Sequence, residues 1–137
     1  MAKGRKVWTY RPVKPRAPTV PAPVKAEVQA RAQHLIATVL GPGHIKPPPK
    51  HPRFNYLVGL STKWWRHYFY FTATYAVPGP NALAPSFTDP FARLEYVGGD
   101  RFHLAFHRHT GEWITVYHDL PLANCLTSIA SDPWFMP

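Results

Sequence analysis

The chain has 137 residues, enough for one domain of ordinary size, and its 45% hydrophobic content excludes a wholly disordered protein. It contains 16 Lys and Arg but only 7 acids, and the formal net charge of +9 favours an anionic partner. A single cysteine excludes an intrachain disulfide, and no apolar run approaches the roughly 20 residues of a membrane-spanning helix. We therefore expect a cytoplasmic protein that does not associate with a membrane.

The positive charge is concentrated in the first half of the chain. Residues 1–66 contain thirteen Lys and Arg and one acid, a net charge of +12, whereas residues 67–137 contain three Arg and six acids, a net charge of −3. A basic segment in front of a nearly neutral body is typical of proteins that bind a polyanion such as nucleic acid. A tail that only improves solubility is the other interpretation.

Residues 1–23 are predicted to form an extended basic arm. Prolines recur every two or three residues from Pro12 to Pro23 and favour polyproline II over helix or sheet. The arm carries six cations and two aromatic rings, which are Lys3, Arg5, Lys6, Trp8, Tyr10, Arg11, Lys14 and Arg16.

Residues 24–137 are predicted to form one α+β domain that begins with a helix. Apolar residues recur at helical spacing over residues 24–40, and Gly41-Pro42-Gly43 should end the helix. Residues 44–53 read as a second proline-rich basic loop, and this loop carries Lys46, Lys50 and Arg53.

From residue 54 onward the pattern predicts four or five antiparallel strands. Aromatic and β-branched residues mark the candidate strands, which cover 56–60, 67–77, 91–97, 101–108 and 112–118. A long loop from Pro78 to Pro90 separates the second strand from the third. Alternation in the second strand places Phe69 and Phe71 on the core side and Tyr68 and Tyr70 on the other face.

The last two strands are predicted to form a hairpin rich in histidine. A two-residue turn at Thr110-Gly111 would pair His103 with His118 and place Trp113 on the face away from the histidines. Opposed histidines can share a metal ion, so the candidate ligands are His103, His107, His109 and His118. A third ligand is not evident, and histidines on a solvent-facing sheet are the interpretation we favour.

Catalytic motifs are weak in this sequence. Cys125 falls on the apolar stripe of a final helix that Asp119 would cap, and Leu122, Leu126 and Ile129 share the stripe. No pair of acids has the spacing of a general acid and base, and no glycine-rich loop has the spacing of a phosphate-binding loop. We expect a binding protein rather than an enzyme, with no cofactor.

A patch of cations and aromatic rings precedes the strongest strand. Lys63, Trp64, Trp65 and Arg66 combine charge for phosphates with rings on which unpaired bases can stack. Core packing is the alternative for each tryptophan, although at least one of two neighbours on a strand should face outward. Together with the arm, this patch predicts nucleic-acid binding, with structured or ribosomal RNA favoured over DNA.

Two other functions are compatible with the same sequence. The polyproline segment from Arg11 to Pro23 could dock into an aromatic groove of a protein partner. The histidines of the hairpin could form a metal-binding protein or metalloenzyme. The sequence leaves the oligomeric state open.

Residues 54–135 resemble small uncharacterised bacterial domains of unknown function. The resemblance rests on FNYLVGL, YFYFTATYAVPGPNAL, FARLEYVGGDRFHLAFHRHTGEW and the closing DPWF. It implies a bacterial protein with an antiparallel sheet flanked by helices, and it implies no catalytic residue.

Overall fold

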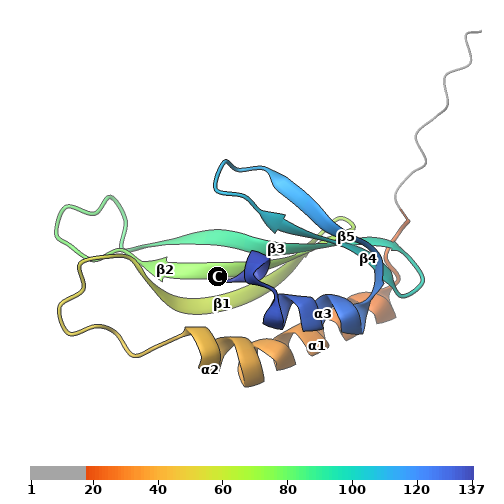
Figure 1. The fold of residues 1–137 in the computed structure, drawn as a ribbon, viewed down its shortest axis with the longest axis horizontal. Coiled ribbons are helices and arrows are strands. Elements are labelled where there is room, and N and C mark those ends of the chain that lie inside the picture. The colour runs from red at the N-terminus through yellow and green to blue at the C-terminus, as the bar shows by residue number, and fades with distance from the viewer. Residues whose placement is uncertain (1–17) are drawn as a thin grey trace, which may run out of the picture.

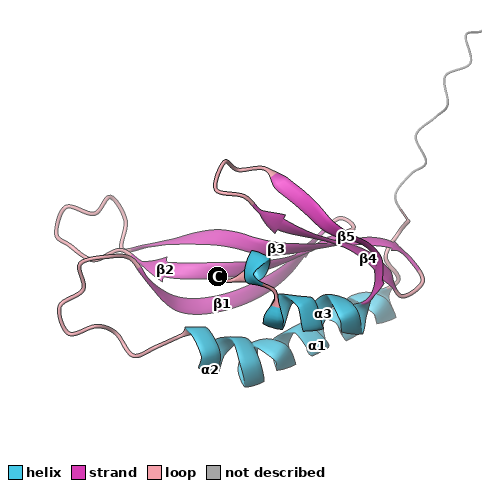
Figure 2. Ribbon diagram, viewed as in Figure 1, coloured by secondary structure: helices cyan, strands magenta, loops and turns pink. Residues whose placement is uncertain are grey.

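The computed structural model describes residues 18–137, and in this part of the chain five strands form one antiparallel sheet (Figures 1 and 2). The strands follow one another in space as they do in sequence, so each pairs with its chain neighbours. Their bounds are β1 Tyr56–Trp65, β2 Tyr68–Ala76, β3 Ser86–Gly98, β4 Arg101–His107 and β5 Trp113–Pro121. The predicted α+β fold, with four or five antiparallel strands between two helices, is confirmed.

The helices lie together on one face of this sheet (Figure 1). Their bounds are α1 Ala22–Leu35, the π-helical turn η1 Ile36–Leu40, α2 Gly41–His44, α3 Leu122–Ser131 and the 3-10 turn η2 Pro133–Phe135. Val28 and Ala32 of α1 and the predicted apolar stripe of α3 join Phe69 and Phe71 in a single buried cluster. Within residues 18–137, no helix has the length and apolar character needed to cross a membrane.

The first helix is longer than predicted at both ends. It starts at Ala22, Val20 already packs in the core, and the predicted boundary of the arm at residue 23 falls inside the helix. The prediction that Gly41-Pro42-Gly43 ends the helix is wrong. A π turn lets Gly41 N–H reach the carbonyl of Ile36, and the chain then continues helically through Pro42, which has no N–H to donate.

The third strand begins within the predicted loop from Pro78 to Pro90. Residues 86–90 pair with the end of β2, and Pro90 is tolerated because a β-bulge follows it at Phe91. The bulge places Phe91 and Ala92 on the core side together. Side chains before and after the bulge, among them Pro90 and Arg93, therefore share the opposite face.

The predicted register of the β4–β5 hairpin is wrong by one residue next to the loop, whereas the predicted neighbours His103 and His118 do lie side by side farther along the strands. Arg108 pairs with Glu112, and Gly111 takes a φ of 93° that closes a three-residue loop instead of a two-residue turn. His107 therefore lies opposite Trp113, which moves Trp113 to the face of His107.

Asp119 does not cap the final helix. It has a φ of 57° within β5, at an irregularity of the pairing with β4, and Pro121 occupies the N-cap position of α3. The predicted stripe of Leu122, Cys125, Leu126 and Ile129 is buried as expected.

The π turn predicts opposite effects at two neighbouring glycines. A Cβ at residue 41 would lie 2.8 Å from the Ile36 carbonyl oxygen, so we expect Gly41→Ala to lower the free energy of unfolding by about 1–3 kcal/mol. At Gly43 a Cβ meets nothing within 4 Å, so Gly43→Ala should be neutral or stabilise by about 0.5–1 kcal/mol. Urea denaturation of both variants checks this. If both substitutions change the free energy of unfolding equally, the π turn is not required for the stability of the fold.

Candidate nucleic-acid interface

The sheet face opposite the helices carries a group of aromatic and basic side chains. Register places them together: Lys63 pairs with Tyr70, Tyr70 with Arg93, and Trp65 with Tyr68. We call the group the aromatic–basic face, and its members are Lys63, Trp65, Arg66, Tyr68, Tyr70, Arg93 and Trp113. Because successive side chains alternate across a strand, this face follows directly from the burial of Phe69, Phe71 and Leu94 on the other side.

Arg93 lies at the centre of this face between two aromatic rings. Its guanidinium carbon is 4.6 Å from the centroid of Tyr68 and 4.9 Å from that of Trp113. Arginine stacks well on rings because its guanidinium is planar and weakly hydrated. The two ring contacts restrict where the guanidinium can lie.

The donors of Arg93 are not used up by the protein. Within residues 18–137, its buried Nε has no hydrogen-bond acceptor, and Arg93 belongs to none of the ion pairs found there. A phosphate or another oxygen-rich anion suits the fork-shaped donor set of a guanidinium.

Trp65 and Arg66 form one end of the face, at the tight turn between β1 and β2. Arg66 takes a φ of 56° there, and its guanidinium carbon lies 4.6 Å from the Trp65 ring centroid. The Trp65 ring is nearly parallel to that of Tyr68, at 15° and 6.5 Å between centroids. Trp65 is nevertheless 51% exposed, so a planar ligand can reach it.

The two carboxylates beside the face are paired with histidines. Glu95 lies 3.4 Å from Nε2 of His67, and Asp89 lies 3.3 Å from Nδ1 of His107. His107 also stacks on Trp113, at 4.7 Å between centroids. Both acids are therefore paired with histidines, and within residues 18–137 no carboxylate forms an ion pair with Arg93.

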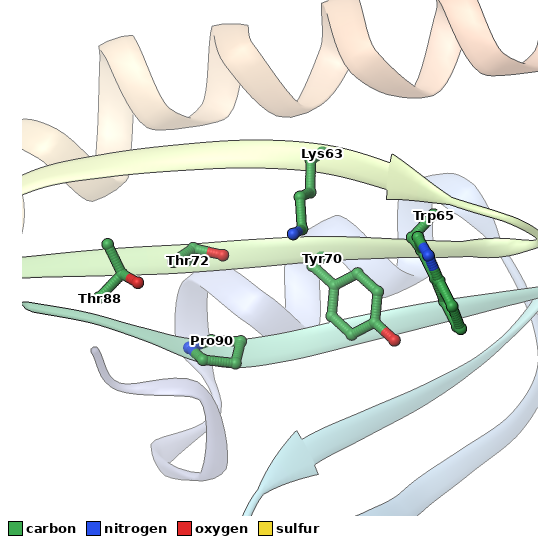
Figure 3. A pocket seen from close by; sticks show the side chains of 6 residues that line it. All are labelled: Lys63, Trp65, Tyr70, Thr72, Thr88 and Pro90. Carbon is green, nitrogen blue, oxygen red and sulfur yellow. The ribbon is translucent and has the colours of Figure 1, made fainter.

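A pocket of about 310 Å³ opens beside Trp65 on the same face. It is lined by residues of β1, β2 and β3, namely Lys63, Trp65, Tyr70, Thr72, Thr88 and Pro90. Figure 3 shows the Tyr70 ring between the Lys63 ammonium group and the Trp65 ring in this view. The pocket combines an aromatic wall, a cation and two hydroxyl groups.

Three of the residues predicted from the sequence meet on this face: Lys63, Trp65 and Arg66 are all exposed there. Trp64 points to the helix side instead, where its Nε1 donates to the Lys25 carbonyl at 3.2 Å and its ring packs on Phe69. We therefore omit Trp64 from the interface. The expectation that one of the two tryptophans faces outward is confirmed.

The other predicted basic residues are not brought to the same place. Lys46, Lys50 and Arg53 are exposed in the loop between α2 and β1, at the opposite end of β1 from Arg66, about 30 Å along the strand (Figure 1). The arm residues lie outside the described residues, and they are Lys3, Arg5, Lys6, Trp8, Tyr10, Arg11, Lys14 and Arg16. The described chain does begin close to the face, because Pro18, Val20 and Lys25 line a pocket of about 280 Å³ together with Arg66 and His67.

The candidate metal ligands of the hairpin do not converge. His103 and His118 are neighbours, with ring centroids 4.9 Å apart, but Nδ1 of His103 already accepts a hydrogen bond from the Asp119 N–H. His107 is paired with Asp89, and His109 is exposed in the hairpin loop. Among residues 18–137, no three His, Cys, Asp or Glu side chains are placed to hold one metal ion.

Cys125 has the environment of a structural residue. It is buried among the apolar residues of α3, and this burial raises the pKa of its thiol to about 12. A thiol with such a pKa is almost entirely protonated at neutral pH, which makes it a poor nucleophile.

The comparisons with known proteins place the chain in a family. No curated protein and no solved structure matches it significantly. A family model described as "Domain of unknown function (DUF3024)" matches residues 20–137, which are most of the chain and all of the described fold except its first two residues. This chain therefore belongs to the DUF3024 family of domains of unknown function.

Proposed function

We propose that this protein binds single-stranded nucleic acid, with RNA favoured over DNA, on the aromatic–basic face of its sheet. The observation that carries the proposal is Arg93, whose guanidinium carbon lies 4.6 Å from the ring centroid of Tyr68 and 4.9 Å from that of Trp113 and which forms no ion pair within residues 18–137. A phosphate would pair with this unneutralised charge. The rings around it would offer surfaces for unpaired bases.

The arrangement favours unpaired over paired nucleic acid. Rings on a broad sheet surface can stack only on bases that are exposed, and the bases of a duplex are stacked on one another. Loops, bulges and ends of RNA present such bases, which keeps a ribosomal or other structured RNA among the candidate partners. The mechanism is non-catalytic: it needs only stacking and the pairing of cations with phosphates.

The basic arm would extend this interface. The described chain starts beside Arg66 and His67, so the arm, which carries six cations in residues 1–17, joins the fold at the Trp65 end of the face. The cations of the loop at residues 45–55 lie at the other end of β1 and would meet a different part of a long partner. Arm and face together explain why the chain concentrates its positive charge before residue 67.

A protein partner that binds the polyproline segment is less well supported. That segment was predicted to extend to Pro23, but α1 begins at Ala22 and Val20 is buried in the core. A histidine-based metal site is not supported by any three-ligand cluster in residues 18–137.

Substitutions on the two sides of the sheet test the proposal. Removal of the ring in Trp65→Ala should weaken binding of a short unpaired RNA by about 1–3 kcal/mol, because one base loses its stacking partner. Arg93→Lys keeps the charge but loses the planar donor fork, so it should weaken binding as well. Fluorescence anisotropy with a labelled oligonucleotide measures both effects.

Matched controls lie on the helix side. Trp134 is 56% exposed and packs on Phe106, and Arg31 is an exposed cation of α1. Trp134→Ala and Arg31→Gln should leave RNA affinity unchanged within about twofold, or ~0.4 kcal/mol. The proposal fails if these variants weaken binding as much as the variants of the aromatic–basic face do.

Removal of residues 1–17 tests the arm separately. The truncated chain keeps Val20 and loses six cations, so its RNA affinity should fall and depend less on salt. Each lost phosphate contact should reduce the slope of log K against log salt concentration by roughly 0.7. An unchanged slope would show that the arm does not contact phosphates, and Trp65→Ala should still weaken the binding that remains.

A further inference from the structure

The pocket beside Trp65 is a hollow in the aromatic–basic face that is lined by residues of three strands. Its volume of about 310 Å³ lies at the lower end of the range for small-molecule sites, roughly 300–1,000 Å³. A hollow of that volume can take one nucleotide. A single strand lying across the face would therefore place one nucleotide in the pocket while its neighbours remain on the open surface.

The lining of the pocket matches the parts of a nucleotide. The exposed ring of Trp65, with Tyr70 and Pro90, provides apolar and aromatic surface for a base. Lys63 is exposed and has no carboxylate partner among the ion pairs of residues 18–137, so its ammonium group is available to a phosphate. Thr72 and Thr88 add hydroxyl groups that can both donate to and accept from a ribose or a base edge.

The β-bulge at Phe91 creates this lining. Without the extra residue in β3, the side chains before the bulge and those after it would face opposite sides of the sheet. Either Thr88 and Pro90 would point to the helices, or Arg93 would. With the bulge, all of them stay on the aromatic–basic face. The pocket and the stacked guanidinium of Arg93 are consequently adjacent parts of one surface.

We propose that this pocket binds a single ribonucleoside 5′-monophosphate unit, with the base against Trp65 and the phosphate at Lys63. The inference rests on the proposed function for its context, since the unit would be one residue of a bound single strand. The inference nevertheless makes a claim of its own: this pocket should also bind the free mononucleotide.

Titration of the full-length protein with adenosine 5′-monophosphate tests the inference. Tryptophan fluorescence and the NMR signals of the pocket residues report the binding. We expect Trp65→Leu to weaken binding about tenfold or more because stacking is lost. Lys63→Gln should weaken binding of the monophosphate severalfold and leave adenosine almost unaffected. Thr72→Val, which replaces the hydroxyl with a methyl group of similar size, should reduce the preference for the ribonucleotide over its 2′-deoxy form.

Lys50→Gln is the matched control for Lys63, because it removes an exposed cation from the loop at the far end of β1. It should not change binding of the mononucleotide. If adenosine 5′-monophosphate perturbs no pocket residue at millimolar concentration, or if Lys50→Gln and Lys63→Gln weaken it equally, the pocket assignment is overturned.

The two proposals fail in different ways. Binding of an unpaired RNA oligonucleotide that depends on Arg93, without any binding of the mononucleotide at the pocket, would overturn the inference and leave the proposed function standing. Binding of the mononucleotide at Lys63 and Trp65, without affinity for any oligonucleotide, would support the pocket and overturn the proposed function.

Discussion

The packing of every described helix on one face of the sheet is the constraint on which the rest of this structure depends. The cluster that joins α1 and α3 to β2, β3 and β4 buries one set of alternating side chains. The other set must then face outward, because successive residues of a strand point to opposite sides. In most antiparallel sheets that set is polar, but here it includes Trp65, Tyr68, Tyr70 and Trp113.

These outward-facing rings pack against cations rather than against a second layer of apolar residues. Arg93 lies between Tyr68 and Trp113, and Arg66 lies over Trp65. Such contacts fix the rings and the guanidinium without covering the whole surface. Contacts of this kind restrict the rotamers of the side chains involved, which reduces the entropy that binding must lose. The same contacts leave donors of Arg93 available for an anion.

The sequence predicted those features that depend on neighbouring residues of one segment. The alternation of Phe69 and Phe71 with Tyr68 and Tyr70 is visible within β2 alone, and the apolar stripe of α3 has plain helical spacing. The predicted interface missed Arg93 and Trp113, which join the face only through pairing between strands. A one-residue error in the hairpin loop was enough to place Trp113 on the wrong face. A π turn through Gly41 and Pro42 has no local signature either, because the same residues ordinarily end a helix.

Mapping an unpaired RNA oligonucleotide onto the isotope-labelled full-length protein by NMR tests the central claim most directly. The account predicts that the largest shifts fall on residues of β1, β2 and β3 that point away from the helices, and on the indole signals of Trp65 and Trp113. The indole of Trp134 and the amides of α1 should barely move. Shifts concentrated on α1, on α3 or on the loop at residues 45–55, with the Trp65 and Trp113 signals unchanged, would contradict it.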